Sequence, residues 1–145
     1  LQQAEQPAVY RLWGPWVLLL FIFTIKSSDI GAYTIGKWVG KHPMTPTISP
    51  GKTWEGLVGA VVFAGAVSFG FSMVCGIMPP LASVIFGVVF GVLGQLGDLA
   101  ESMIKRDAAA KDASSRIPGF GGLLDVIDSP LATGPAAYIF FSLVL

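Results

Sequence analysis

The sequence is short of charge and of cysteine. Charged residues make up 12% of its 145 residues and hydrophobic residues 53%, with a mean hydropathy of +0.70. Soluble domains carry about 25% charged residues, so this chain lacks the charge that a water-facing surface needs. Its formal net charge is +0, which argues against nucleic acid because no basic stripe can neutralise a phosphate backbone. The composition therefore indicates an integral membrane protein.

Two further absences narrow the class. Cys75 is the single cysteine and lies in an apolar run, so it supports neither an intramolecular disulfide nor a cysteine metal site, and a buried thiol is expected. The opening residues lack the basic and apolar regions of a signal peptide and an initiator Met. The last residues are still apolar, and we expect residues 1–145 to form a single membrane domain that is the C-terminal part of a larger protein.

Four apolar segments stand out against a span of about 20 residues. They cover about residues 15–36, 53–77, 81–104 and 125–145. Lipid offers the backbone no hydrogen-bond partners, so these segments are expected to be helices rather than strands. The predicted fold class is all-α: a polytopic membrane helical bundle with about four transmembrane helices.

Basic residues orient the segments. The connection Met78–Pro80 has no charge, whereas seven of the nine Lys and Arg residues lie in the two flanking connections: Lys37, Lys41, Lys52, Lys105, Arg106, Lys111 and Arg116. Alternating helices place those two connections on one side, and the positive-inside rule makes that side cytoplasmic. We expect a multi-pass protein of the cell membrane, in the bacterial inner membrane, with a site facing the cytoplasm.

Gly87 and Gly91 have GxxxG spacing, which permits close helix contact. Packing inside the bundle is the expected use, and a homodimer face is the alternative.

Ionisable residues interrupt the apolar pattern at three places, and such residues mark functional sites by default. The interruptions are Lys26–Asp29, then Asp98, Glu101, Ser102 and Lys105, then Asp125 and Asp128. The second set shares one helix face, as does the third. A glycine-rich connection, residues 118–122, returns the chain between them, so the acids could converge on a hard cation such as Mg²⁺.

Structural interpretations compete with this one. Glu101 and Lys105 could form a simple ion pair, Asp125 could stabilise a helix start, and the basic residues could fix topology or touch anionic lipid. The acids and bases taken together favour a functional site. Gly51-Lys52-Thr53 resembles the end of a P-loop, but Pro46 stands where that motif needs glycine, and a loop is expected before it rather than a strand.

The segment Ser102–Asp128 resembles the diagnostic motif of the phosphatidate cytidylyltransferases (CDP-diacylglycerol synthases). The matching positions are Ser102, Lys105, Arg106, Lys111, Asp112, Pro118, Gly121, Gly122, Asp125 and Asp128. The stretches at 29–33, 49–56 and 97–102 are also similar to the family, so the resemblance extends over most of the chain. Phe120 and Val126 depart from it, because the family usually has His and Arg there. His42, the only histidine, is expected to be a solvated loop residue rather than a base.

The resemblance implies a nucleotidyltransferase of phospholipid biosynthesis that converts phosphatidate and CTP to CDP-diacylglycerol and pyrophosphate. The implied catalytic residues are Asp98, Asp125, Asp128, Lys105 and Arg106, and the three acids would also hold Mg²⁺. The implied substrate-binding residues are Lys52, Ser49, Thr53, Glu101, Ser102, Lys111, Asp112, Gly121 and Gly122. A second, monovalent cation such as K⁺ is expected on resemblance alone.

Three other functions compete with this one. A CTP-dependent lipid kinase such as a polyprenol kinase would use a similar set of acids and bases. A CDP-alcohol phosphotransferase would need its D-x₂-D-G-x₂-A-R pattern, which is absent because Ser129-Pro130 follow Asp128. A transporter or channel would spread its charges through the membrane depth, whereas here they gather at one side.

Overall fold

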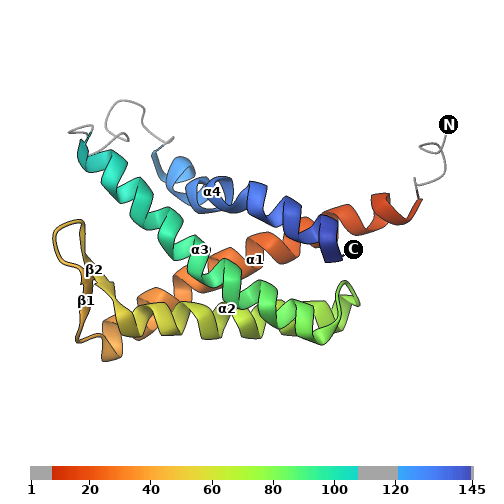
Figure 1. Cartoon of the computed structure of the whole chain (residues 1–145), viewed down its shortest axis with the longest axis horizontal. Coiled ribbons are helices and arrows are strands. Elements are labelled where there is room, and N and C mark those ends of the chain that lie inside the picture. The colour runs from red at the N-terminus through yellow and green to blue at the C-terminus, as the bar shows by residue number, and fades with distance from the viewer. Residues whose placement is uncertain (1–7, 108–120, 145) are drawn as a thin grey trace.

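A computed structural model of the chain describes residues 8–107 and 121–144, with side chains described for residues 14–103 and 130–144. Helices and one hairpin follow one another in the order α1 (Ala8–Val39), β1 (Pro43–Thr45), β2 (Ser49–Thr53), α2 (Trp54–Cys75), α3 (Pro80–Asp107) and α4 (Gly121–Val144). Helix α1 packs along α2, α2 along α3, and α3 along α4 (Figure 1). The predicted all-α bundle is confirmed.

Three of the helices are long and apolar enough to cross a membrane. Their candidate spans are Gly14–Val39, Trp54–Cys75 and Pro80–Met103. The apolar stretch found in α4 is the shorter Pro130–Val144, so the described residues give the fourth predicted span only in part. Helix α1 also begins earlier than predicted and continues through Pro15.

Close backbone contacts join the first three helices through glycine. A Cβ atom on Gly31 would lie 2.5 Å from the carbonyl oxygen of Gly59, so α1 and α2 approach more closely there than a larger side chain allows. A Cβ on Gly87 would lie 2.5 Å from the Cα of Gly65, and one on Gly91 would lie 3.2 Å from the Ala64 Cβ. The GxxxG pair therefore packs α3 against α2 inside the chain, as expected.

Buried hydroxyl groups bond to carbonyl oxygens of neighbouring helices. Ser28 Oγ donates to the Gly91 carbonyl at 3.1 Å, and Ser68 Oγ donates to the Ser83 carbonyl at 2.7 Å. Without water in the hydrocarbon, a hydroxyl must find its partner inside the protein. These bonds tie α1 to α3 and α2 to α3.

Aromatic rings join α4 to the bundle at the end far from the hairpin. The rings of Phe86 and Phe90 stack with centroids 4.3 Å apart, and Phe141 lies 4.9 Å from Phe86. Phe21 of α1 meets the edge of Phe90 at 6.1 Å. The apolar core therefore contains residues of α1, α3 and α4.

The connection between α1 and α2 is an antiparallel hairpin, where the sequence predicted a proline-rich loop. Pro43 pairs with Thr53 and Thr45 with Ser49. The stretch Gly51-Lys52-Thr53 consequently does lie in a strand before a helix, so that part of the argument against a P-loop was wrong. The exclusion still holds on spacing, because Pro46 occupies the required glycine position.

Candidate active site

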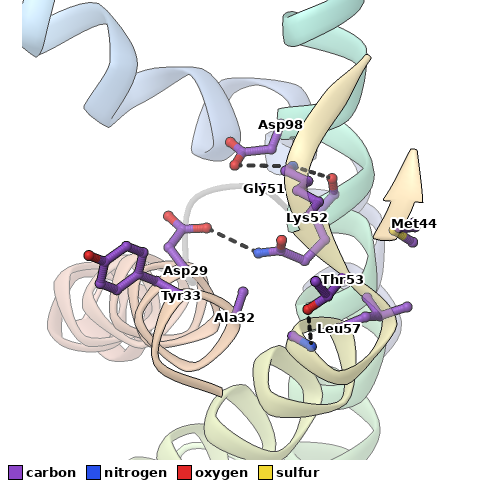
Figure 2. Close-up of a pocket in the computed structure, with 11 residues that line it drawn as sticks. Asp29, Ala32, Tyr33, Met44, Gly51, Lys52, Thr53, Leu57 and Asp98 are labelled. Atoms are coloured by element: carbon purple, nitrogen blue, oxygen red, sulfur yellow. Dashed lines mark hydrogen bonds and ion pairs between the residues drawn. The ribbon is translucent and has the colours of Figure 1, made fainter. Parts of the chain in front are cut away.

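A cavity of about 170 Å³ opens where the hairpin meets α1, α2 and α3. Figure 2 shows Asp29 of α1 and Asp98 of α3 pointing toward the same space, with Lys52 of β2 beside Asp98. The lining residues come from α1, β1, β2, α2 and α3: Asp29, Ala32, Tyr33, Met44, Gly51, Lys52, Thr53, Gly56, Leu57, Gln95 and Asp98.

Lys52 and Asp98, which both line this cavity, form an ion pair. The Lys52 ammonium lies 3.3 Å from Asp98 Oδ2 and donates to the backbone carbonyl of Gln95 at 3.1 Å. Their side chains are 19% and 35% exposed, so the pair is screened from solvent without being sealed. The structure thus brings together two residues that the sequence assigned to the site from separate segments.

Asp29 is a second carboxylate of the cavity that the predicted site omitted. Its Oδ2 lies 3.3 Å from the Lys26 ammonium, and its Oδ1 lies 3.4 Å from the Gln95 amide nitrogen. The sequence feature that could have identified Asp29 is its position as an ionisable residue within an apolar run. Gln95 gave the same signal, an amide three residues before Asp98 in an apolar helix, and it was missed.

Two predicted substrate-binding residues of the hairpin differ in their placement. Thr53 lines the cavity and also caps α2, because its Oγ1 accepts a hydrogen bond from the Gly56 N–H at 3.1 Å. Ser49 begins β2 opposite Thr45 and does not line the cavity.

Glu101 and Ser102 lie on the turn of α3 that follows Asp98, outside the cavity lining. Ser102 Oγ donates to the Asp98 carbonyl at 2.9 Å, which is a bond within the helix.

The remaining predicted site residues lie where side chains are not described. Lys111 and Asp112 fall outside the described residues altogether. Helix α3 contains positions 105 and 106, and helix α4 contains positions 121, 122, 125 and 128, by backbone only. The predicted convergence of Asp98 with Asp125 and Asp128 therefore stays a prediction.

One contact between described residues locates α4 relative to Asp98. A Cβ atom built on Gly97 would lie 3.3 Å from the Ala132 Cβ, so α4 packs against α3 beside Asp98. Helical periodicity relates position 132 to positions 128 and 125, four and seven residues earlier.

The donor chemistry of the cavity suits a hard divalent cation held together with a substrate. No group of three or more His, Cys, Asp or Glu residues arranged for a metal occurs among the residues that the structure describes. Mg²⁺ commonly takes only one or two carboxylates and completes its shell with water and phosphate oxygens. Asp29 and Asp98 supply two carboxylates to one cavity, so the residues present fit that mode of binding.

His42 is solvated, as expected, but it is not an isolated loop residue. Its ring is 77% exposed, and Nδ1 lies 2.6 Å from Glu55 Oε1 at the start of α2.

Comparison with known proteins places the whole arrangement in a family. The profile described as the Cytidylyltransferase family matches residues 5–144. Curated relatives named phosphatidate cytidylyltransferase include those of Mycobacterium tuberculosis, 40% identical over 89% of this chain and 39% of the relative, and of Haemophilus influenzae, 40% identical over 88% and 46%. The Bacillus subtilis relative is 41% identical over 86% of this chain and 48% of its own length.

The chain spans less than half the length of each of these relatives, from 39% to 48%. The profile match covers all four helices and the hairpin, and so includes every element that lines the cavity. The chain belongs to the cytidylyltransferase family.

Proposed function

We propose that the protein transfers the cytidylyl group of CTP to phosphatidate, forming CDP-diacylglycerol and pyrophosphate. The observation that carries this proposal is the Lys52–Asp98 pair, held with Asp29 in one cavity between the hairpin and three apolar helices. Acids and a lysine at that place suit a reaction between a polyanionic nucleotide and a lipid phosphate. The relatives named phosphatidate cytidylyltransferase support the same substrates.

The reaction joins two anionic groups, so charge neutralisation and positioning dominate its catalysis. A phosphate oxygen of phosphatidate attacks the α-phosphorus of CTP, the bond from that phosphorus to the bridging oxygen breaks, and pyrophosphate leaves. The phosphate monoester needs little help from a base, because its second pKa is about 6 and it is already largely ionised near neutral pH.

Lys52 supplies the positive charge that the described part of the cavity directs at the phosphates. Its ammonium bonds to Asp98 and to the Gln95 carbonyl. A phosphate oxygen can replace these partners while the ammonium keeps its position. Lys105, Arg106 and Lys111 are proposed to neutralise the remaining charge, with the Gly121 and Gly122 amides approaching a phosphate.

Asp98 and Asp29 are proposed to hold Mg²⁺ with the substrate phosphates, joined by Asp125 and Asp128. When bound, Mg²⁺ would supply positive charge that stabilises the phosphoryl oxygens. Asp29 extends the predicted set of ligands, because it comes from α1 while Asp98 comes from α3. A monovalent cation such as K⁺ is a further proposal that rests on resemblance. The GxxxG spacing does not support a homodimer, because Gly87 and Gly91 pack against α2 within the chain.

The size and place of the cavity fit the phosphate end of the reaction. A volume of about 170 Å³ is smaller than the roughly 300–1,000 Å³ of a typical ligand site. It is therefore proposed to hold phosphate groups rather than a whole nucleotide. The lipid tails would stay in the bilayer while the head group reaches the cavity. The side that carries the basic connections is proposed to face the cytoplasm of a bacterial inner membrane.

The deciding experiment supplies the full-length protein in membranes with phosphatidate, Mg²⁺ and CTP labelled either at the α- or at the γ-phosphorus. We expect α-label in the lipid product and γ-label in pyrophosphate. A lipid kinase would instead place the γ-label in the lipid and release CDP. Absence of labelled CDP-lipid and pyrophosphate, with the protein intact and inserted, would overturn the proposal.

A further inference from the structure

The hairpin that carries Lys52 is too small to hold its own shape. Strand β1 has three residues and β2 has five, and an isolated two-stranded hairpin is marginally stable at best in water. Lys52 is the penultimate residue of β2. Its ammonium can reach Asp98 reliably only if another contact fixes the hairpin relative to the helices.

Such a contact exists at the base of the hairpin. Glu55 Oε2 accepts a hydrogen bond from the backbone N–H of His42 at 3.3 Å, and Glu55 Oε1 lies 2.6 Å from His42 Nδ1. The backbone N–H of Trp54 donates to the His42 carbonyl at 3.1 Å. The residue just before β1 is thus bonded three times to the first two residues of α2.

These bonds fix the position of Lys52 relative to the helix bundle. Glu55 lies in the first turn of α2, behind the Thr53 cap. Helix α2 packs against α1 through the Gly31–Gly59 contact, so Glu55 belongs to the rigid bundle. Only two residues separate Lys52 from Glu55 along the chain, and the neighbouring residue Thr53 pairs with Pro43.

The exposure of the His42 and Glu55 side chains indicates that their contact affects the hairpin rather than the stability of the whole protein. The two side chains are 77% and 24% exposed. Exposed ion pairs contribute little to global stability, because solvent screens them. Three bonds at the mouth of a short hairpin can nevertheless decide whether its strands stay closed.

We propose that His42 and Glu55 form a hairpin clamp that positions Lys52 at the substrate phosphates. They are positioning residues, since neither lines the cavity. The catalytic part of this inference rests on the proposed function, whereas the structural part does not.

Hydrogen exchange of the full-length protein in lipid nanodiscs, followed by mass spectrometry, tests the structural part. His42→Ala removes the contact of Nδ1 with Glu55 and keeps the two backbone bonds of residue 42. It is expected to speed amide exchange in residues 43–53 by about threefold or more and to leave residues 60–75 of α2 unchanged. His42→Asn should restore slow exchange, because its amide nitrogen stands the same number of bonds from Cα as Nδ1. Lys41→Ala, a change at the exposed residue next to His42, is the matched control. Unchanged exchange in the hairpin, or equal acceleration in the helices, would overturn the clamp.

Kinetics then test whether the clamp acts through Lys52. His42→Ala should lower kcat/KM for CTP by between about 10-fold and 100-fold, with recovery in His42→Asn. In a Lys52→Met background the same change should cost nothing further, because the positioned group is already gone. A loss of equal size in both backgrounds would show that His42 acts elsewhere. If the parent protein makes no CDP-lipid, the proposed function fails while the exchange experiment still decides the clamp.

Discussion

The Lys52 ammonium and the Asp98 carboxylate lie 3.3 Å apart although the two residues stand 46 positions apart along the chain. One belongs to a hairpin strand and the other to a membrane-crossing helix. Their contact therefore depends on the fold of the bundle and on the placing of the hairpin, and each of these can be perturbed separately.

Removing the charge of Lys52 should disable phosphate binding without unfolding the protein. Lys52→Met keeps the length of the side chain and is expected to lower kcat/KM by about 100-fold or more, the usual effect of losing one donor aimed at developing charge. Steady-state assays with CTP and phosphatidate measure this. Lys37→Met, a change at an exposed lysine of α1 outside the cavity, is the control, and normal turnover by Lys52→Met would contradict the assigned role.

Magnesium dependence should respond to both acids of the cavity. Chelation is expected to abolish activity and added Mg²⁺ to restore it. Asp29→Asn and Asp98→Asn should each raise the Mg²⁺ concentration for half-maximal rate by about tenfold or more, because each removes a charged oxygen ligand. Lys52→Met should lower the rate without raising this concentration. An unchanged Mg²⁺ requirement in Asp29→Asn would remove Asp29 from the proposed ligand set.

Asp125 is the sharpest test of the part of the site predicted from sequence alone. Asp125→Asn is expected to abolish turnover while expression and membrane insertion stay nearly normal, since the change keeps size and removes only charge. Product assays and membrane fractionation measure the two effects. Loss of the inserted protein would instead show a structural role for this residue.

The departure at Phe120 tests whether the chemistry needs an imidazole. We expect Phe120→His to change kcat by less than about threefold near neutral pH, because the lipid phosphate is already ionised there. A large gain, with a new titration in the pH–rate profile, would reveal missing proton transfer.

Helix packing gives a stability prediction with a matched control on one helix. Gly59→Ala should destabilise the protein by about 1–3 kcal/mol through overpacking, since its Cβ would lie 2.6 Å from the Gly31 carbonyl oxygen. Gly70→Ala, with nothing within 4 Å of the new Cβ, should be neutral or stabilising by up to about 1 kcal/mol. Thermal unfolding in detergent compares them, and equal midpoints would contradict the close α1–α2 contact.

The bundle could be predicted from sequence because long apolar runs admit few structures in a membrane. The use of Gly87 in internal packing followed from its spacing in the same way. The hairpin could not, because two very short strands containing Pro43 and Pro50 carry the composition of a loop. Bonds between His42 and the start of α2 join the two ends of the hairpin, and no local sequence pattern indicates them.

The sequence predicts which site residues share a face of one helix, but not which residues of different segments meet. Periodicity places Asp98, Glu101 and Ser102 on one face, but it does not say which neighbour that face meets. Asp29 joins Asp98 because Ser28 bonds to the Gly91 carbonyl and holds α1 against α3. Such a contact between distant segments has no signature in local spacing. An acid or amide inside an apolar run marks only where to look.

Delivering Lys52 from a hairpin has a consequence for biogenesis. A lysine at the centre of an inserting helix costs about 2.5–3.5 kcal/mol in translocon-mediated insertion. Here Lys52 lies between two candidate spans along the chain, so it adds no charge to either of them as they partition into the bilayer. Its partner Asp98 arrives near the end of the third span, so the ion pair can form only after the later helix has been threaded.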